Sequence, residues 1–318
     1  MTDSVRLFFI SASEATMRLA MALIGVLALG GCAAPALKSG QKAATAAAAC
    51  PADPTWDTPS APHHIHGNTW YVGTCGISSI LITSDQGHVL IDGTTKKGAA
   101  SVEANIRALG FKVEDVRYIL SSHEHLDHAG GIAQLQRDSG ATVVALPAEA
   151  ASLERGQGDR GDPQFLSTPA FAPVRAVRRI EAGETLTLGP IALTAHATPG
   201  HTPGSTSWTW RSCDQAGQCR AIAYADSLTP FSDDVYRYTD EAAHPGFIAA
   251  FRQSLITVAN LPCDILLTPH PGASELFSRL GPGATRPLVD AGACRAYSAT
   301  GAAKLDARIA KERGDAKP

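Results

Sequence analysis

The sequence predicts an α/β fold built from two similar halves. Short runs of β-branched and aromatic residues, bounded by Gly or Asp turns, alternate with segments in which apolar residues recur at helical spacing. The stretch 156–173 divides the two halves, because it is rich in Gly, Asp and Pro and has no hydrophobic period. Each half therefore holds a strand meander, a helix and a further strand, and we expect two packed βα layers around buried sheets.

In the first half, three strand signals come first, and helices and strands alternate after them. The helix at 98–109 is predicted from Val102, Ile106 and Leu109, which recur at helical spacing, and Gly110 follows as a stop signal. The expected elements are, in chain order, strands at 69–72, 79–83 and 88–91, the helix at 98–109, a strand at 116–120, a short helix at 131–137, a strand at 142–146 and a helix at 148–154.

The second half repeats this order. Its expected elements are strands near Leu186 and at 191–195, 206–210 and 221–225, a helix at 245–260, a strand at 264–267 and a final amphipathic helix from Arg286 onward.

The composition excludes two classes of protein. Hydrophobic residues make up 44% of the 318 residues and charged residues only 18%, which is incompatible with a disordered chain. The 27 basic and 30 acidic side chains leave a net charge of −3, so nothing points to a nucleic acid or another polyanion as partner.

The N-terminal 31 residues read as a signal segment, with Met17 as an alternative functional start. From Met17 the chain carries one positive charge and an apolar run that ends in Gly30, Gly31 and Cys32, a secretory pattern too short to span a membrane. The ending resembles a bacterial lipoprotein signal, so Cys32 is either lipidated or lies near an ordinary cleavage site. We therefore expect a periplasmic protein that contacts a membrane only through a lipid on Cys32, with an Ala/Pro-rich tether over 32–62.

The cysteines are expected to form disulfides, because the periplasm is oxidising. Apart from Cys32, six cysteines remain, and six cysteines allow fifteen pairings. Cys213 and Cys219 flank a short loop between two strand-like runs, so a hairpin would bring them together. The pairing of Cys50 with Cys75 stays open, since a free thiol at Cys50 is the alternative.

The segment 121–131 concentrates metal-binding side chains where a hydrophobic strand ends and a helix begins. Three histidines and one aspartate fall within six residues: His123, His125, Asp127 and His128. In an extended loop His123 and His125 project to the same side, whereas Asp127 and His128 project differently at the turn. One segment can thus serve two metal ions. A surface histidine cluster is the alternative interpretation.

This His-x-His-x-Asp-His pattern resembles the signature of the metallo-β-lactamase superfamily. The resemblance covers most of the chain from about Trp56 to Ala310. It implies a four-layer αβ/βα sandwich of two similar halves with the metal site at the sheet edge, and a single catalytic domain over 63–318. The further matching stretches are TPGHTPGS at 198–205, LTPHP at 267–271, and, for subclass B3, residues 71–81, residues 224–228 and the pair Cys263 and Cys294.

Carried over by position, the resemblance implies two Zn²⁺ ions per chain. The first would be held by His123, His125 and His201, and the second by Asp127, His128 and His270. Three imidazoles and one solvent species form an open tetrahedral site, which is typical of catalytic rather than structural zinc.

The resemblance also assigns roles to residues near the second metal. Ser227 and, less closely, Thr229 match positions whose hydroxyls contact a substrate carboxylate. Asp226 has two interpretations: a metal-bridging aspartate, as in the wider superfamily, or a residue that supports a ligand, which the flanking residues favour. The Cys263–Cys294 disulfide is implied in the same way.

The remaining candidates carry weaker signals. His196 is expected to be a packing histidine, His63, His64 and His66 an exposed arm, and Glu124 a solvent-facing residue. Trp56 is either a core residue or a border of the active site. Substrate contacts are expected from the loop 156–173, with Gln157 and Phe165 as candidates, and from the hairpin 213–219.

The implied function is hydrolysis of the β-lactam amide bond of penicillins, cephalosporins and carbapenems, and hence antibiotic resistance. A hydroxide that bridges the two zinc ions attacks the lactam carbonyl, while Asp127 ligates the second ion and orients the hydroxide. The partner is then a small-molecule β-lactam. Two alternatives remain: another hydrolase of the same fold, such as a lactonase or thioester hydrolase, and an exported zinc-binding lipoprotein without catalysis.

Overall fold

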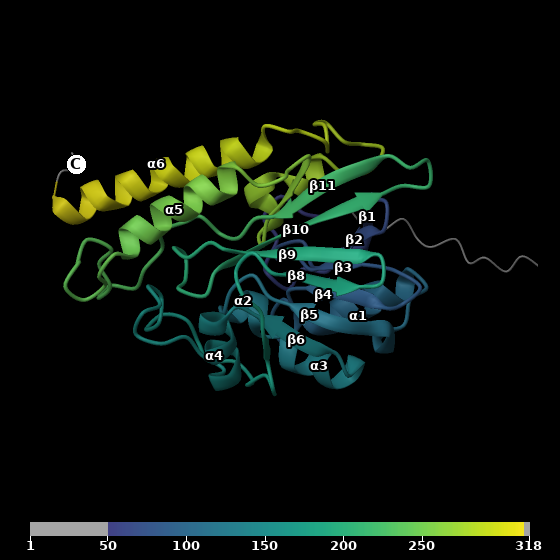
Figure 1. The fold of residues 1–318 in the computed structure, drawn as a ribbon, viewed down its shortest axis with the longest axis horizontal. Coiled ribbons are helices and arrows are strands. Elements are labelled where there is room, and N and C mark those ends of the chain that lie inside the picture. Colours follow the sequence, from purple (N-terminus) through teal and green to yellow (C-terminus); the bar gives the residue numbers. More distant parts are fainter. Residues whose placement is uncertain (1–49, 315–318) are drawn as a thin grey trace, which may run out of the picture. The chain divides into compact units, whose positions relative to one another are not determined.

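Two β-sheets pack face to face, and helices cover the outer side of each (Figure 1). The computed structural model describes residues 50–314, all of which belong to one compact unit. The predicted signal segment, the alternative start at Met17, the lipidation site Cys32 and the first part of the tether lie outside the described residues.

The first sheet has seven strands in chain order, from β1 to β7. Strands β1 to β4 pair antiparallel, and β4 to β7 pair parallel. Its strands are β1 (His63–His66), β2 (Thr69–Tyr71), β3 (Ile80–Ile82), β4 (His88–Ile91), β5 (Val116–Leu120), β6 (Thr142–Ala145) and β7 (Arg178–Arg179).

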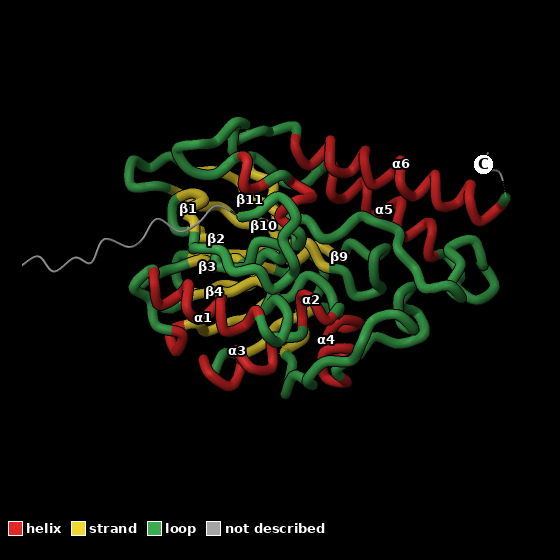
Figure 2. Tube along the Cα trace, turned by 180° about the vertical axis from the view of Figure 1, so that it is seen from behind, coloured by secondary structure: helices red, strands yellow, loops and turns green. Residues whose placement is uncertain are grey.

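Helices follow the parallel strands of this sheet, since parallel neighbours need crossover connections. They lie on its outer face in both views (Figure 2). They are α1 (Gly98–Ala108), the 3₁₀ turn η1 (Val113–Asp115), α2 (Leu126–Ala129), α3 (Ile132–Ser139) and α4 (Pro147–Arg155).

The second sheet has five strands in the order β12-β11-β10-β9-β8. Only β11 and β12 run parallel, and α5 connects them across the outer face, where α6 packs beside it (Figure 1). The elements are β8 (Thr185–Leu188), β9 (Ile191–Ala197), β10 (Thr206–Cys213), β11 (Cys219–Tyr224), α5 (Phe247–Ala259), β12 (Ile265–Leu267), the turns η2 (Pro271–Ser274) and η3 (Leu276–Ser278), and α6 (Ala293–Arg313).

The alternation of side chains along each strand builds three apolar layers. On β4, Val89 and Ile91 point into the core between the sheets, whereas Leu90 points to the helices on the outer face. On β12, Leu266 likewise points to α5 and α6, and its neighbours point inward. Both faces of each sheet are therefore buried, which confirms the four-layer sandwich.

Besides shifts of a few residues at other element ends and the short strand β7, three features differ from the expectations. Residues 63–66 form the edge strand β1 rather than an exposed arm, because their backbone pairs with β2. The last helix begins at Ala293 instead of Arg286, because the Arg279 guanidinium donates hydrogen bonds to the carbonyl oxygens of Pro287 and Leu288, outside the helix. The described end of the predicted tether is also anchored, since Pro59 pairs with Thr74.

The structure pairs all six cysteines of the described region. The disulfides are Cys50–Cys75, Cys213–Cys219 and Cys263–Cys294. The first settles the open alternative for Cys50 and ties the start of the described chain to the first sheet. Across residues 50–314, no helix combines the length and apolar character needed to cross a membrane.

Candidate metal centre

The predicted ligands come from loops that leave the two sheets at one edge. The loop after β5 carries His123 and His125, the helix α2 that follows it carries Asp127 and His128, and the loops after β9 and β12 carry His201 and His270. The Thr206 amide donates to the Ser122 carbonyl at 2.7 Å and so joins the first two loops. Open α/β sheets bind ligands at the carboxyl ends of their strands, and this edge follows that rule.

His123, His125 and His201 form one buried group, with one nitrogen of each ring within 4.8 Å of the others. The opposite nitrogen of each ring has an oxygen partner. His123 Nδ1 lies 2.8 Å from Asp226 Oδ1, His125 Nε2 lies 3.2 Å from both oxygens of Asp162, and His201 Nδ1 lies 2.8 Å from the Thr229 carbonyl.

These partners leave His123 Nε2, His125 Nδ1 and His201 Nε2 for a metal. His123 Nε2 is buried without a hydrogen-bond partner, which is costly for a ring nitrogen unless a cation uses its lone pair. Oxygen partners that fix the tautomer of a ligand histidine are typical of metal centres. The donor set therefore fits a metal ion.

Asp127, His128 and His270 form a second, tighter group. His128 Nε2 lies 3.1 Å and His270 Nε2 lies 3.3 Å from Asp127 Oδ2, and the two nitrogens are 3.3 Å apart. Ligands about 2.05 Å from a tetrahedral zinc ion would be about 3.3 Å from each other. The three atoms thus have the spacing of one face of a zinc tetrahedron.

Asp92, at the end of β4, supports the second group from below. Its side chain accepts hydrogen bonds from the Ser122 amide at 2.7 Å, the Ser122 hydroxyl at 2.7 Å and the Tyr224 hydroxyl at 2.6 Å. Asp92 Oδ2 also lies 3.5 Å from His128 Nδ1. Because Tyr224 belongs to β11, this cluster joins both sheets directly beneath the site.

The electrostatics keep most of these ligands ready for a cation. Burial and the neighbouring His125 lower the pKa of His201 to about 3, and burial with the neighbouring His128 lowers the pKa of His270 to about 4. Burial opposes a charge on His128, but Asp127 and Asp92 outweigh it and raise its pKa to about 10. A metal ion beside Asp127 would replace the proton that His128 otherwise holds.

A cavity of about 390 Å³ opens onto both groups, a size typical of small-molecule sites. Trp56 borders this cavity and is half-exposed, which agrees with its interpretation as a border of the site and not with a core position. Its lining includes the predicted contacts Ser227 and Thr229 together with Gln164, Phe231 and His270.

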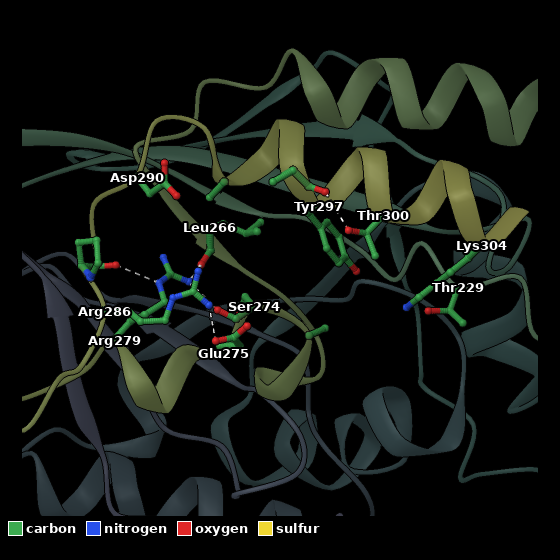
Figure 3. Close-up of a pocket in the computed structure, with 14 residues that line it drawn as sticks. Thr229, Leu266, Ser274, Glu275, Arg279, Arg286, Asp290, Tyr297, Thr300 and Lys304 are labelled. Carbon is green, nitrogen blue, oxygen red and sulfur yellow. Dashed lines mark hydrogen bonds and ion pairs between the residues drawn. The ribbon is translucent and has the colours of Figure 1, made fainter.

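A second pocket, of about 260 Å³, lies between η2 and α6 and shares Thr229 with the first (Figure 3). Apart from Lys304, its charged side chains have partners in the protein. Arg286 pairs with Glu275, and Arg279 donates to four backbone carbonyls, including those of Leu266 and Ser274. This pocket therefore holds a structural hydrogen-bond network. It differs in this from the metal centre, where ring nitrogens are left for an ion.

The structure shows the contacts of Asp226 and His196, two residues near the predicted ligands. Asp226 is fully buried and contacts the outer nitrogen of His123, so it supports a ligand instead of bridging the two groups. His196 bonds Thr209 Oγ1 at 2.8 Å, as expected for a packing histidine.

Glu124 corrects an expectation. It is 2% exposed and accepts a hydrogen bond from Thr202 Oγ1 at 2.7 Å, because the loop after β9 folds over it. Burial and the nearby Asp162 raise its pKa. Gly204 lies so close that an added Cβ would sit 2.7 Å from Glu124 Oε2 and 2.8 Å from the Glu149 backbone.

The expected substrate contacts are corrected as well. Gln157 stays at the end of α4, where its amide bonds the Ser152 carbonyl, and Phe165 turns to a neighbouring pocket under Arg160. Gln164, Ser167, Thr168 and Pro169 are the residues of this loop that line the cavity. The hairpin 213–219 lies at the far end of β10, about 23 Å from its beginning at seven residues of about 3.3 Å each.

Sequence reasoning missed Asp92 and Asp162. A single aspartate in a turn carries no local signal that it will meet a histidine far along the chain. Asp92 does have a positive φ of 64°, but that conformation becomes visible only in the fold.

Comparisons with known proteins agree with this geometry. The model of the family "Metallo-beta-lactamase superfamily" matches residues 72–214. The crystal structure of the metallo-β-lactamase MIM-1 from Novosphingobium pentaromativorans is 53% identical with a TM-score of 0.79, covering 82% of this chain and 94% of that one. MEM-A1, a subclass B3 metallo-β-lactamase from a soil metagenome library, is 44% identical with a TM-score of 0.79, covering 82% and 100%.

Two curated relatives match over shorter segments. A probable metallo-hydrolase of Burkholderia pseudomallei is 31% identical over 174 residues, which are 51% of this chain and 56% of that protein. A hydroxyacylglutathione hydrolase of Anaeromyxobacter dehalogenans is 36% identical over 94 residues, 30% of this chain and 29% of that protein. The chain thus spans about half or less of the curated relatives it matches.

The loop ligands, the sandwich fold and the near-complete coverage of these solved structures lead to one conclusion. The chain belongs to the metallo-β-lactamase superfamily of hydrolases and, within it, to subclass B3.

Proposed function

We propose that the protein is a zinc-dependent β-lactamase that hydrolyses the lactam amide of penicillins, cephalosporins and carbapenems. The observation that carries the proposal is the pair of adjoining ligand groups at the floor of one cavity. Similarity to the lactamases MIM-1 and MEM-A1 over most of their length supports the same reaction.

We assign one zinc ion to His123, His125 and His201 and a second to Asp127, His128 and His270. When bound, zinc supplies a water that ionises near neutral pH and a Lewis acid for the lactam carbonyl. Unequal donor sets of this kind support catalysis over storage, since a structural or storage site is usually closed by four protein ligands.

The chain's own groups bind the substrate and direct the water. Asp127 Oδ2 faces the two imidazoles of the second group, which leaves its other oxygen to orient the attacking water. The hydroxyls of Ser227 and Thr229 on the cavity wall would bind the substrate carboxylate, and Trp56 and Phe231 offer apolar area to its side chains. No nucleophilic side chain is required.

The periplasm is the compartment we propose for this reaction. The secretory pattern ending at Cys32 and the three disulfides support export, and lipidation of Cys32 would anchor the protein to a membrane. Fractionation of expressing cells, with mass spectrometry of the mature N-terminus, separates a lipidated Cys32 from ordinary cleavage.

A thioester hydrolase is the second candidate, because a hydroxyacylglutathione hydrolase is among the relatives. The position of Asp226 behind His123, away from the space between the ligand groups, favours the lactamase. Purified zinc-loaded protein should be given a penicillin, a cephalosporin, a carbapenem, an acyl-homoserine lactone and a hydroxyacylglutathione thioester, each with and without a chelator. Absence of chelator-sensitive β-lactam turnover would refute the proposal, and turnover of the thioester or lactone alone would establish the alternative.

The ligand assignment has its own test. His123→Ala is expected to lose one zinc ion per chain and most activity, whereas His196→Ala should keep both ions, because His196 only bonds Thr209. Metal analysis of the purified variants measures this, and equal zinc loss in both would overturn the assignment.

A further inference from the structure

The loop 156–173 supplies a side chain that contacts a proposed metal ligand. Both carboxylate oxygens of Asp162 lie 3.2 Å from His125 Nε2, and Asp162 is only 2% exposed. A buried carboxylate in a surface loop is unfavourable unless it is paired. His125 is thus the partner that makes this burial tolerable.

Asp162 also fixes the part of the loop that reaches the cavity. Its Oδ1 accepts a hydrogen bond from the Gln164 amide at 2.9 Å, an Asx-type turn that sets the path of the next two residues. The Gln164 side chain lies on the cavity wall, with Nε2 3.5 Å from His201 Nε2. One carboxylate therefore sets the position of a ligand ring and of a cavity-lining residue together.

Between Asp159 and Ala170, most backbone hydrogen bonds stay within the loop, and two reach the segment at Asp233. The Asp233 amide donates to the Pro163 carbonyl at 2.8 Å, and Asp233 Oδ2 accepts from the Leu166 amide at 3.1 Å. Leu166 is 51% exposed, and Asp159 and Arg160 are exposed too. A segment whose hydrogen bonds are mostly local and whose side chains are partly exposed belongs to the low-stability end of a fold, so a single added contact changes its order measurably.

A metal on His125 would strengthen that contact. Ligation through Nδ1 leaves the ring proton on Nε2, which faces Asp162, whereas a metal-free neutral ring can place the proton on either nitrogen. The cation also makes this N–H a stronger donor to a carboxylate.

We propose that Asp162 is a positioning residue that couples the order of the loop 156–173 to metal binding at His125, so that the cavity wall is set only when the first ligand group holds its ion. The inference rests on the proposed zinc site. Because coupling between two equilibria is reciprocal, the loop contact in turn tightens the first zinc site.

The test compares hydrogen exchange of the loop in zinc-free and zinc-loaded protein. In the wild type, zinc should slow exchange of the amides 164–167 about 10-fold. In Asp162→Ala this protection should vanish, and zinc affinity at the first site should fall about 10- to 100-fold, as is typical when the partner of a ligand histidine is lost. Asp162→Asn, which keeps a neutral acceptor, should fall between the two.

Asp159→Asn is the matched control, because Asp159 belongs to the same loop but its side chain bonds only Arg155 and the Gly161 amide, and the substitution keeps the carbonyl that accepts from the Asp162 amide. It should retain both the zinc protection and the affinity. Exchange at residues 210–213, at the far end of β10, should match in all variants and shows that each is folded.

Loop exchange that zinc leaves unchanged in wild-type protein carrying two ions would overturn the coupling alone, as would wild-type zinc affinity in Asp162→Ala. Wild-type protein that binds no zinc would overturn the proposed function and the coupling with it. Zinc-dependent protection in a protein that hydrolyses no β-lactam would support the coupling and refute only the proposed reaction.

Discussion

Tyr224→Phe is the substitution that isolates the link between the two sheets beneath the metal centre. The Tyr224 hydroxyl is fully buried and donates to Asp92 Oδ2 at 2.6 Å. A hydrogen bond to a charged group contributes about 1.5–3 kcal/mol. The variant leaves a void of one oxygen atom, too small for water, so no solvent replaces the lost donor.

We expect the free energy of unfolding to fall by about 2 kcal/mol, at the lower half of that range, because Asp92 keeps both donors of Ser122. For a domain of this size the melting temperature should fall by roughly 4–8 °C. Zinc content should remain that of the wild type, since Tyr224 contacts no proposed ligand.

The assay is denaturant unfolding at one fixed excess of zinc, because a bound ion adds to apparent stability. Tyr118→Phe on β5 is the control, as it removes the hydroxyl of a partly buried tyrosine outside the Asp92 cluster and should change stability by less than about 0.5 kcal/mol. A Tyr224→Phe variant as stable as the wild type, or equal losses in both variants, would refute the reasoning.

Three further predictions follow from the same contacts. Gly204→Ala places a methyl group against Glu124 and a rigid backbone, so we expect a loss of at least about 2 kcal/mol and weaker zinc binding, measured by unfolding and metal titration; an unchanged affinity would contradict the packing argument. Replacing Cys213 and Cys219 by serine opens a short loop remote from the cavity and should cost about 2 kcal/mol of stability while leaving kcat and KM unaltered, so a kinetic change would speak against the position of the hairpin. Trp56→Ala should raise KM about 10-fold with a smaller change in kcat, because the half-exposed ring offers binding area but no ligand, and a selective loss of kcat would assign it another role.

The elements were largely predictable because they obey local rules. The helix α1 follows its apolar spacing and ends beside Gly110, one residue earlier than expected. The start of α6 was not predictable, because Arg279 captures the carbonyls before it from another part of the chain. Edge strand β1 was missed since its residues gain a partner only when β2 lies beside them.

The ligand groups were predictable in part for the same reason. His123, His125, Asp127 and His128 are neighbours in sequence, so their pattern carries the signal by itself. His201 and His270 required the family resemblance, because nothing local joins them to that segment.

The sequence by itself determined the α/β class, the metal-binding residue types and the hairpin disulfide, because each depends on residues that are close along the chain. Only the tertiary structure decided which nitrogen of each histidine is free, that Asp226 and Asp162 support His123 and His125, and that Gln164 rather than Phe165 faces the cavity. These outcomes depend on hydrogen bonds between residues separated by as many as 103 positions. Such contacts exist only after the two sheets have packed and brought the ends of their strands to one edge.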